Sequence, residues 1–257
     1  MSSSVRPRTS YNIVGRSALV TGGASGIGAA CARELAAHGV SVTVADLDDV
    51  NAQRVAQQIN GTAWEVDLGD VAALEAVRLD YDILVNNAGV QSVSPIVDFP
   101  PDRFRAMLAL MVEAPFLLIR AALPHMYEHG FGRIVNISSV HGTRASAYKS
   151  AYVTAKHALE GLSKVTALEG AAHGVTSNCV SPAYVRTPLV DRQIADQAKA
   201  HGIPEEDVER EIFLSESAVK RLVEPDEVAS LVGWLCSDSA RMVTGASYTM
   251  DGGWSAR

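Results

Sequence analysis

Short runs of β-branched and apolar residues alternate along this chain with longer segments of helical pattern. Nearly continuous apolar strands that are separated by helices form a parallel sheet with both faces covered. We therefore expect the α/β class, as a single domain built on a doubly wound, Rossmann-type parallel sheet. The runs are SALVT (17–21), VSVTVAD (40–46), AWEVDL (63–68), DILVNNA (82–88), GRIVNIS (132–138), VTSNCVSP (175–182) and ASYTMDGG (246–253).

The domain boundaries follow from composition along the chain. Residues 1–11 carry two arginines but no apolar core, which predicts a flexible N-terminal tail rather than a secretory signal. The sequence contains no internal repeat and no Gly/Ser-rich linker, so residues 12–257 are expected to form one domain. The stretch 184–222 is polar, charged and helical in pattern and follows a strand, which predicts a substrate lid over the C-terminal edge of the sheet.

The charge balance limits the partners of the protein. A formal net charge of -7 and a pI near 5.5 argue against a nucleic-acid surface or an anionic membrane as the main partner. No apolar run approaches the roughly 18 residues that a membrane span needs. Cys31, Cys179 and Cys236 lack metal-ligand spacing, and their apolar neighbours favour buried free thiols. We expect a cytoplasmic protein without a metal centre.

A glycine-rich turn, TGGASGIG at 21–28, joins the first strand to the first helix. Such a turn lets backbone amides and a positive helix terminus approach a pyrophosphate, although glycines also make ordinary tight turns. Asp46 closes the second strand 18 positions after Gly28, near the offset at which an acid holds the adenosine ribose. Its alternative role is that of a solvent-facing acid. Because a carboxylate there repels a 2′-phosphate and no Arg or Lys adjoins it, we expect NAD rather than NADP.

Two further turns leave strands at the same edge of the sheet. Asp67, in EVDLGD, is placed to accept from the adenine amino group, and NNAG (86–89) follows the strand beside which the cofactor would lie. Asparagine pairs also stabilise turns through side-chain to backbone hydrogen bonds. Both roles are compatible here.

A helix that begins near Ser150 places Tyr152 and Lys156 four residues apart on one face. Tyr148 has no lysine at that spacing, which singles out Tyr152. A nearby ammonium favours the phenolate, so we expect a Tyr152 pKa lowered toward the working range. The residue would then act as general base in alcohol oxidation and as acid in ketone reduction, without a metal. Ser139, at the end of the preceding strand, is expected to share the substrate oxygen.

These motifs, together with the terminal DGG (251–253), resemble the short-chain dehydrogenase/reductase family over roughly residues 12–254. The resemblance implies seven strands in the order 3-2-1-4-5-6-7, a homotetramer, and catalytic roles for Ser139, Tyr152 and Lys156. It also implies that Lys156 binds the nicotinamide ribose and that Thr187 reaches the cofactor carboxamide. The cofactor-binding residues expected in this way are Gly22, Ser25, Gly26, Ile27, Gly28, Asp46, Asp67, Leu68, Asn87, Ala88, Gly89, Tyr152, Lys156, Pro182, Val185 and Thr187.

The chain departs from the family pattern at two places. Members commonly carry a catalytic asparagine in the long helix after NNAG, and the corresponding position here is Met111, whose thioether is only a weak acceptor. Protons then leave by another route or turnover is slowed. A nucleotide-binding sensor or scaffold without turnover therefore stays open as a hypothesis. The linker between Asp70 and Tyr81 is several residues short, so its helix is expected to be a stub.

Three stretches narrow the resemblance to the subfamily of bacterial D-3-hydroxybutyrate dehydrogenases: 86–96, 138–164 and 187–203. The subfamily pattern places two glutamines, a histidine and a lysine around the substrate carboxylate, which agrees with the need to neutralise one end of a small hydroxy acid. The expected substrate-binding residues are Gln91, Ser139, His141, Lys149, Tyr152 and Gln193.

The function implied is hydride transfer between NAD and a small 3-hydroxy acid, with D-3-hydroxybutyrate giving acetoacetate and the reverse, a reaction of ketone body metabolism. A dehydrogenase for another small alcohol or sugar is the alternative within the family. Each substrate residue also has an ordinary role that the sequence leaves open. Lys149 would be a solvated lysine at a helix start, His141 an exposed loop histidine, and Gln91 and Gln193 surface amides.

Overall fold

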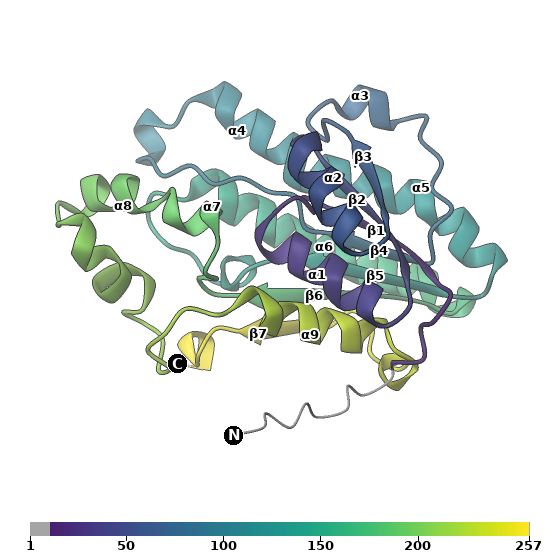
Figure 1. Ribbon diagram of the computed structural model, residues 1–257. Helices are drawn as coiled ribbons and strands as arrows, with labels where there is room; N and C mark the ends of the chain where they lie inside the picture. The colour runs from purple at the N-terminus through teal and green to yellow at the C-terminus, as the bar shows by residue number, and fades with distance from the viewer. Residues whose placement is uncertain (1–10, 257) are drawn as a thin grey trace, which may run out of the picture.

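The computed structural model describes residues 11–256, which form one parallel sheet of seven strands (Figure 1). The order in the sheet is β3-β2-β1-β4-β5-β6-β7, so the predicted doubly wound α/β fold and its strand order are confirmed. The order reverses between β1 and β4, and this switch point is where ligands of such sheets bind. The strands are β1 (Ser17–Thr21), β2 (Ser41–Asp46), β3 (Thr62–Glu65), β4 (Ile83–Asn86), β5 (Gly132–Ile137), β6 (Val175–Pro182) and β7 (Ser247–Met250).

Helices cover both faces of the sheet. One layer holds α1 (Gly26–Ala37), α2 (Asp49–Gln58) and α9 (Pro225–Cys236). The other holds α3 (Val71–Leu74), α5 (Ala114–Glu128) and α6 (Ser150–Gly170), with α4 (Pro101–Leu108) packed on α6. The α3 helix is the stub that the short linker predicts. The remaining short elements are η1 (Ile96–Asp98), η2 (Ala109–Glu113), η3 (Val140–Gly142), η4 (Ala171–His173), α7 (Pro188–Asp191), α8 (Ile194–His201), η5 (Glu205–Asp207), η6 (Glu209–Phe213), η7 (Asp238–Ala240) and η8 (Trp254–Ala256).

Strand β1 shows how the sequence fills both layers. Ala18 and Val20 pack into the layer of α1 and α9, whereas Leu19 packs into the layer of α5. Successive side chains of a strand point to opposite faces, and all three of these are fully buried. An apolar residue is therefore needed at every position, which is why the central strands read as continuous apolar runs.

The helical stretch Pro101–Glu128 is more apolar than we expected from the sequence. Its mean hydropathy reaches 1.9 over an 18-residue window, so length and composition alone would permit a membrane span. The expectation that no stretch reaches this level is wrong. In the fold, Leu118, Ala122 and Met126 of this stretch are buried against the sheet. A core helix in contact with a sheet needs the same composition, and this packing accounts for the apolar run.

The carboxyl ends of the parallel strands meet at one edge of the sheet, and the segments that follow them carry the candidate site. The segment 184–222 follows β6 and lies beside the sheet, in green in Figure 1. Its helices enclose a small apolar core of their own, made of Tyr184, Val190, Ala198, Val208, Phe213, Leu214 and Leu222.

The N-terminal region begins with Tyr11 among the described residues. Its ring lies 4.1 Å from the His38 ring and packs beside Gly233 of α9. Residues 1–10, the rest of the predicted tail, lie outside the described part of the chain.

Candidate active site

The glycine turn between β1 and α1 needs glycine for two reasons. Gly22 and Gly26 have φ angles of +61° and +52°, in the left-handed region that glycine adopts without steric cost. A Cβ on Gly22 would lie 2.8 Å from the Ala88 Cα, and a Cβ on Gly26 would lie 3.1 Å from the Thr187 methyl group. The turn is therefore pressed between the exit of β4 and the segment after β6, with the N-terminus of α1 beside it.

Gly28 lies close to the turn at the start of α1. It lines neither of the two cavities described below. A Cβ at this position would lie 2.2 Å from the Gly22 carbonyl oxygen and 2.6 Å from the Asn87 amide nitrogen. Gly28 thus lets α1 start close to the turn, and its contact with the cofactor stays a prediction.

Asp46 is the last residue of β2, and its carboxylate is hydrogen-bonded to the backbone of the glycine turn. Its two carboxylate oxygens accept from the backbone N–H groups of Ala24 at 2.9 Å and of Asp48 at 3.0 Å. Each oxygen keeps a second lone pair, so the carboxylate is still able to accept from ribose hydroxyls. Asp67 similarly accepts from the Gly69 N–H at 2.8 Å.

Asn87 ties the exit of β4 to the glycine turn. Its amide nitrogen donates to the carbonyl oxygens of Thr21 and Gly22 at 2.9 and 3.0 Å, and its backbone N–H donates to the Thr21 hydroxyl at 2.9 Å. Asn87 therefore stabilises the turn, which is one of the two roles expected for the asparagine pair, whereas the Asn86 amide donates to Asn136 Oδ1 at 2.9 Å.

These turns enclose a groove of about 330 Å³, which we call the dinucleotide groove. A groove beside a helix N-terminus, with glycines where any Cβ would intrude and a carboxylate at the end of β2, suits a dinucleotide with its pyrophosphate at the turn. The lining residues are Gly22, Ser25, Gly26, Ile27, Asp46, Leu47, Val66, Asp67, Leu68, Asn87, Ala88, Gly89, Val90, Leu110, Thr187, Pro188, Leu189 and Arg192.

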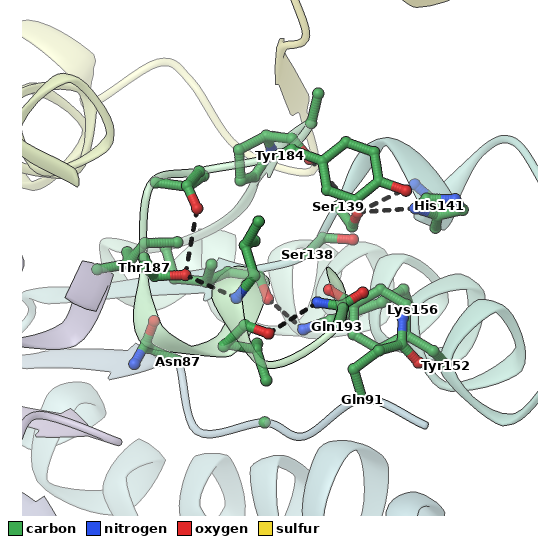
Figure 2. Close-up of a pocket in the computed structure, with 18 of the residues that line it drawn as sticks. Asn87, Gln91, Ser138, Ser139, His141, Tyr152, Lys156, Tyr184, Thr187 and Gln193 are labelled. Atoms are coloured by element: carbon green, nitrogen blue, oxygen red, sulfur yellow. Dashed lines mark hydrogen bonds between the residues drawn. The ribbon is translucent and has the colours of Figure 1, made fainter. Parts of the chain in front are cut away.

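A second, smaller cavity of about 100 Å³ adjoins the groove and shares Ile27, Asn87, Gly89, Thr187 and Leu189 with it. We call it the catalytic cavity (Figure 2). All six expected substrate residues line it, as do Pro182 and Val185. Its complete lining is Ile27, Asn87, Gly89, Gln91, Ile137, Ser138, Ser139, His141, Lys149, Tyr152, Lys156, Pro182, Ala183, Tyr184, Val185, Thr187, Leu189, Val190 and Gln193.

Of the three expected catalytic residues, Ser139 follows β5 at the start of η3, and Tyr152 and Lys156 lie on α6. The Lys156 ammonium donates to the Ile137 carbonyl oxygen at 2.6 Å and lies 5.5 Å from the centroid of the Tyr152 ring. The Ser139 hydroxyl donates to the Pro182 carbonyl oxygen at 3.3 Å and accepts from the His141 N–H at 3.2 Å. The fold thus brings a phenol, a hydroxyl and an ammonium to one wall of the cavity.

The direction of the Tyr152 pKa differs from the expectation. Desolvation raises the pKa of Tyr152 to about 12, against the opposing effect of a hydrogen bond with Ser139. Burial also lowers the pKa of Lys156 to about 8. The expected lowering of the Tyr152 pKa by its lysine is wrong for the protein without its cofactor. Desolvation of the phenolate raises the pKa by more than the neighbouring protein groups lower it. Among these groups Tyr152 is a neutral phenol at pH 7.

Lys149 and His141 also line the cavity, and both are 3% exposed. Lys149 Nζ donates to the Tyr184 hydroxyl at 2.7 Å, and burial lowers the pKa of Lys149 to about 8. Burial, with help from Lys149 and His157, lowers the pKa of His141 to about 3. The readings of a solvated lysine and an exposed histidine are therefore wrong. At neutral pH, His141 offers a neutral ring and Lys149 offers the charge.

The two glutamines also belong to the cavity rather than to the surface. The Gln193 amide nitrogen donates to the Leu189 carbonyl oxygen at 3.0 Å, whereas its buried amide oxygen has no hydrogen-bond partner among the described residues. The Gln91 amide oxygen accepts from the Ser92 N–H at 2.8 Å, which leaves its amide nitrogen as a donor. Both glutamines line the same cavity as Lys156 and Tyr152 (Figure 2).

The charge on the cavity wall has one sign. The lining contains two lysines and no aspartate or glutamate among the described residues. Lys156 still interacts electrostatically with Glu160, but the buried Lys149 ammonium has no carboxylate partner among the described lining residues, which makes this a site for an anion. No group of three or more His, Cys, Asp or Glu side chains within residues 11–256 could hold a metal ion.

Tyr184, Arg192 and Met111 occupy positions that were not expected from the sequence. Tyr184 lines the catalytic cavity and holds Lys149, and Arg192 lines the dinucleotide groove from the segment after β6. Met111 is 1% exposed and packs with Met107 and Ala155 behind Tyr152, so it lines neither cavity. The exit of β6 signalled the region of Tyr184, but its partner lies 35 residues earlier in the chain.

Comparison with known proteins places this geometry in a family. The family described as enoyl-(acyl carrier protein) reductase, within the short-chain alcohol dehydrogenase group, matches residues 22–255. A D-beta-hydroxybutyrate dehydrogenase of Cupriavidus necator is 44% identical over 95% of this chain and 99% of its own length. A second, from Rhizobium meliloti, is 43% identical over 94% and 99%.

A solved structure of another dehydrogenase has a similar fold. A putative 2-deoxy-D-gluconate 3-dehydrogenase from Agrobacterium tumefaciens, crystallised with bound NADP, superimposes with a TM-score of 0.84 at 30% identity. The match covers 97% of this chain and all of that one. The chain therefore belongs to the short-chain dehydrogenase/reductase family and is an oxidoreductase of that type.

Proposed function

We propose that this protein is an NAD-dependent dehydrogenase of small 3-hydroxy acids that interconverts D-3-hydroxybutyrate and acetoacetate. The observation that carries the proposal is the catalytic cavity, which holds two buried lysines, a neutral histidine and two amides but no acid among its described residues. A carboxylate is the group that such a wall accommodates. The identity to D-beta-hydroxybutyrate dehydrogenases over nearly the whole chain supports the same substrate class.

The size of the cavity supports a small substrate. At about 100 Å³ it is well below the roughly 300–1,000 Å³ of pockets that hold drug-sized ligands. In the proposed pose, the carboxylate meets Lys149, His141, Gln91 and Gln193, and the hydroxyl meets Tyr152.

Tyr152, Ser139 and Lys156 have different roles in the proposed proton transfer. In the reducing direction, the neutral Tyr152 phenol donates its proton to the carbonyl oxygen, and Ser139 supports that oxygen by a hydrogen bond. In the oxidising direction, Tyr152 must first release its proton to solvent, and the Lys156 ammonium favours the phenolate that results. The phenolate then takes the hydroxyl proton of the substrate as the hydride leaves its carbon. Bound NAD would supply the hydride acceptor for the carbon that carries the hydroxyl, and its positive ring would favour the phenolate further.

The preference for NAD rests on Asp46, whose carboxylate at the end of β2 would repel a 2′-phosphate. Arg192 lines the same groove, and the Agrobacterium relative holds NADP, so both cofactors belong in the test. We also propose that Ser25, Ile27, Leu68, Thr187 and the other lining residues named above contact the dinucleotide, that residues 184–222 act as the lid, and that the protein is a cytoplasmic homotetramer.

The direct test follows NADH absorbance with each enantiomer of 3-hydroxybutyrate and with NAD or NADP. We expect turnover with the D form and NAD, little with the L form, and a lower kcat/KM with NADP. Equal activity with both enantiomers, or no activity with the D form, contradicts the substrate assignment. Faster oxidation of uncharged polyols than of hydroxy acids would instead support a sugar or alcohol dehydrogenase. NAD binding without any hydride transfer would support the sensor hypothesis.

A further inference from the structure

Among the described residues, the buried Lys149 side chain, which lines the catalytic cavity, makes one hydrogen bond to a side chain. Its ammonium donates to the Tyr184 hydroxyl at 2.7 Å and lies 4.6 Å from the centroid of the Tyr184 ring. No carboxylate among the described lining residues is available to hold it. The position of this charge inside the cavity therefore depends on Tyr184.

Tyr184 is itself fixed by the segment 184–222. Its ring stacks on Phe213, with centroids 4.2 Å apart and an interplanar angle of 27°. It also lies nearly parallel to Trp254 at 6.4 Å. An aromatic ring clamped in this way has little rotamer freedom left, so its hydroxyl is a fixed point toward which the flexible lysine stem is drawn.

We propose that Tyr184 is a positioning residue that holds the Lys149 ammonium toward the cavity and thereby sets the affinity for small carboxylates. This inference rests on the proposed function, because it assumes that the substrate of this cavity carries a carboxylate. Lys149 has three N–H donors, of which Tyr184 accepts one, and the other two are left for an anion. The phenol ring also closes the cavity on this side.

The surroundings of Lys149 decide what a change of pH does to it. His141 of η3, Tyr152 and Lys156 of α6, and Tyr184 are the titratable groups that share the cavity, and His201 of α8 stacks edge-on against the neighbouring Tyr148. His141 stays neutral above its pKa of about 3, and burial keeps the tyrosines protonated through pH 9. Of the titratable groups that line the cavity, the two lysines, each with a pKa of about 8, are the ones that lose charge in this range.

The test measures the inhibition constant of butyrate, competitive with 3-hydroxybutyrate, between about pH 6 and 9, where a carboxylate is fully ionised. Butyrate has no hydroxyl, so its binding does not report proton transfer at Tyr152. Tyr184→Phe keeps the ring and its stacking but removes the acceptor. We expect a roughly ten-fold rise of the butyrate constant and of KM near pH 7.5, with kcat changed less than about three-fold, as for one lost hydrogen bond to a charge.

The pH profile and a double variant separate this role from a structural one. In the wild type, butyrate binding should weaken above about pH 8, and in Tyr184→Phe the same loss should occur about one pH value lower. In a Lys149→Met background, Tyr184→Phe should not change the butyrate inhibition constant or KM further, because both substitutions remove the same interaction. Tyr148→Phe, which removes the adjacent phenol, is the matched control and should leave every constant unchanged.

The outcomes distinguish a failure of the proposed Tyr184 role from a failure of the proposed function. A Tyr184→Phe variant with normal butyrate affinity and a normal pH profile overturns the role of Tyr184 while 3-hydroxybutyrate oxidation by the wild type still stands. An additive effect in the Lys149→Met background, or equal losses in kcat and affinity, also overturns it. A wild-type protein that neither oxidises 3-hydroxybutyrate nor binds butyrate overturns the proposed function and this inference together.

Discussion

Replacement of Lys149 by Met should weaken substrate binding and yet stabilise the fold. The lysine is 3% exposed, and burial lowers its pKa from 10.5 to about 8. That difference corresponds to about 3 kcal/mol of destabilisation at pH 7, because the folded protein holds a charge that the unfolded chain leaves in water. Methionine has a similar length and carries no charge.

Part of this gain is lost again in the single variant. The Tyr184 hydroxyl would lose its donor at 2.7 Å, and an unpaired buried hydroxyl costs about 1–3 kcal/mol. We therefore expect Lys149→Met to unfold at the wild-type temperature or a few degrees above it. The double variant Lys149→Met/Tyr184→Phe removes both partners and should gain up to about 3 kcal/mol, or roughly 6–12 °C for a domain of this size.

The pH dependence has a definite sign. The native pKa of Lys149 lies below its unfolded value, so the unfolded chain binds more protons between about pH 8 and 10.5. The penalty is complete below about pH 8 and is relieved as the pH rises toward 10.5. The stabilisation of the double variant over the wild type should accordingly shrink across this window.

The assays are thermal unfolding by circular dichroism at pH 7 and pH 9.5, and steady-state kinetics with D-3-hydroxybutyrate. The KM should rise about 10- to 100-fold, as expected for a lost hydrogen bond to a charge, and kcat should change little. Lys164→Met, an exposed lysine of the same helix α6, is the control and should alter neither quantity. A double variant that unfolds below the wild type at pH 7 would refute the reasoning about buried charge.

Three further predictions concern the other parts of the site. Tyr152→Phe should lower kcat by about 10²–10⁴-fold, the usual contribution of a general acid or base, and should leave the NAD dissociation constant from calorimetry nearly unchanged. Gly28→Ala should weaken NAD binding in the same experiment, because its Cβ would lie 2.2 Å from the Gly22 carbonyl oxygen. Gly161→Ala, which meets no neighbouring atom, is its control. Met111→Asn should lower the unfolding free energy by about 1–3 kcal/mol without raising kcat, because it buries an amide among apolar side chains. A gain in kcat would contradict the placement of Met111 behind Tyr152.

Much of the fold follows from the sequence because each strand obeys a local rule. The run SALVT must be apolar on both faces to lie in the middle of the sheet, and Ala18, Leu19 and Val20 satisfy that rule without reference to distant residues. The strand order, in contrast, follows from family resemblance, since local pattern does not specify which strands become neighbours. The 101–128 stretch shows the limit of composition, because a core helix and a membrane span need the same residues.

The membership of the site was also predictable, since every expected catalytic and substrate-binding residue lines the catalytic cavity. Motif spacing fixes positions on one helix or at one strand end, as with Tyr152 and Lys156. For Gly28, the spacing shows that glycine is required but does not show that the Gly22 carbonyl oxygen and Asn87 are the neighbours that require it. Tyr184 was missed because its value comes from Lys149 and Phe213, which the fold brings together from separate segments.

Protonation is the property that the sequence could not give, and it decides how the site works. A lysine four residues from a tyrosine lowers the tyrosine pKa only if its favourable interaction with the phenolate exceeds the cost of desolvating that phenolate. Here burial withdraws both side chains from water, so the pKa of Tyr152 rises while those of Lys149 and Lys156 fall. The protein therefore keeps two costly ammonium groups and one neutral phenol in the same cavity. Since an incoming carboxylate returns part of the energy spent on burying Lys149, the same desolvation that destabilises the fold favours the anion over an uncharged substrate.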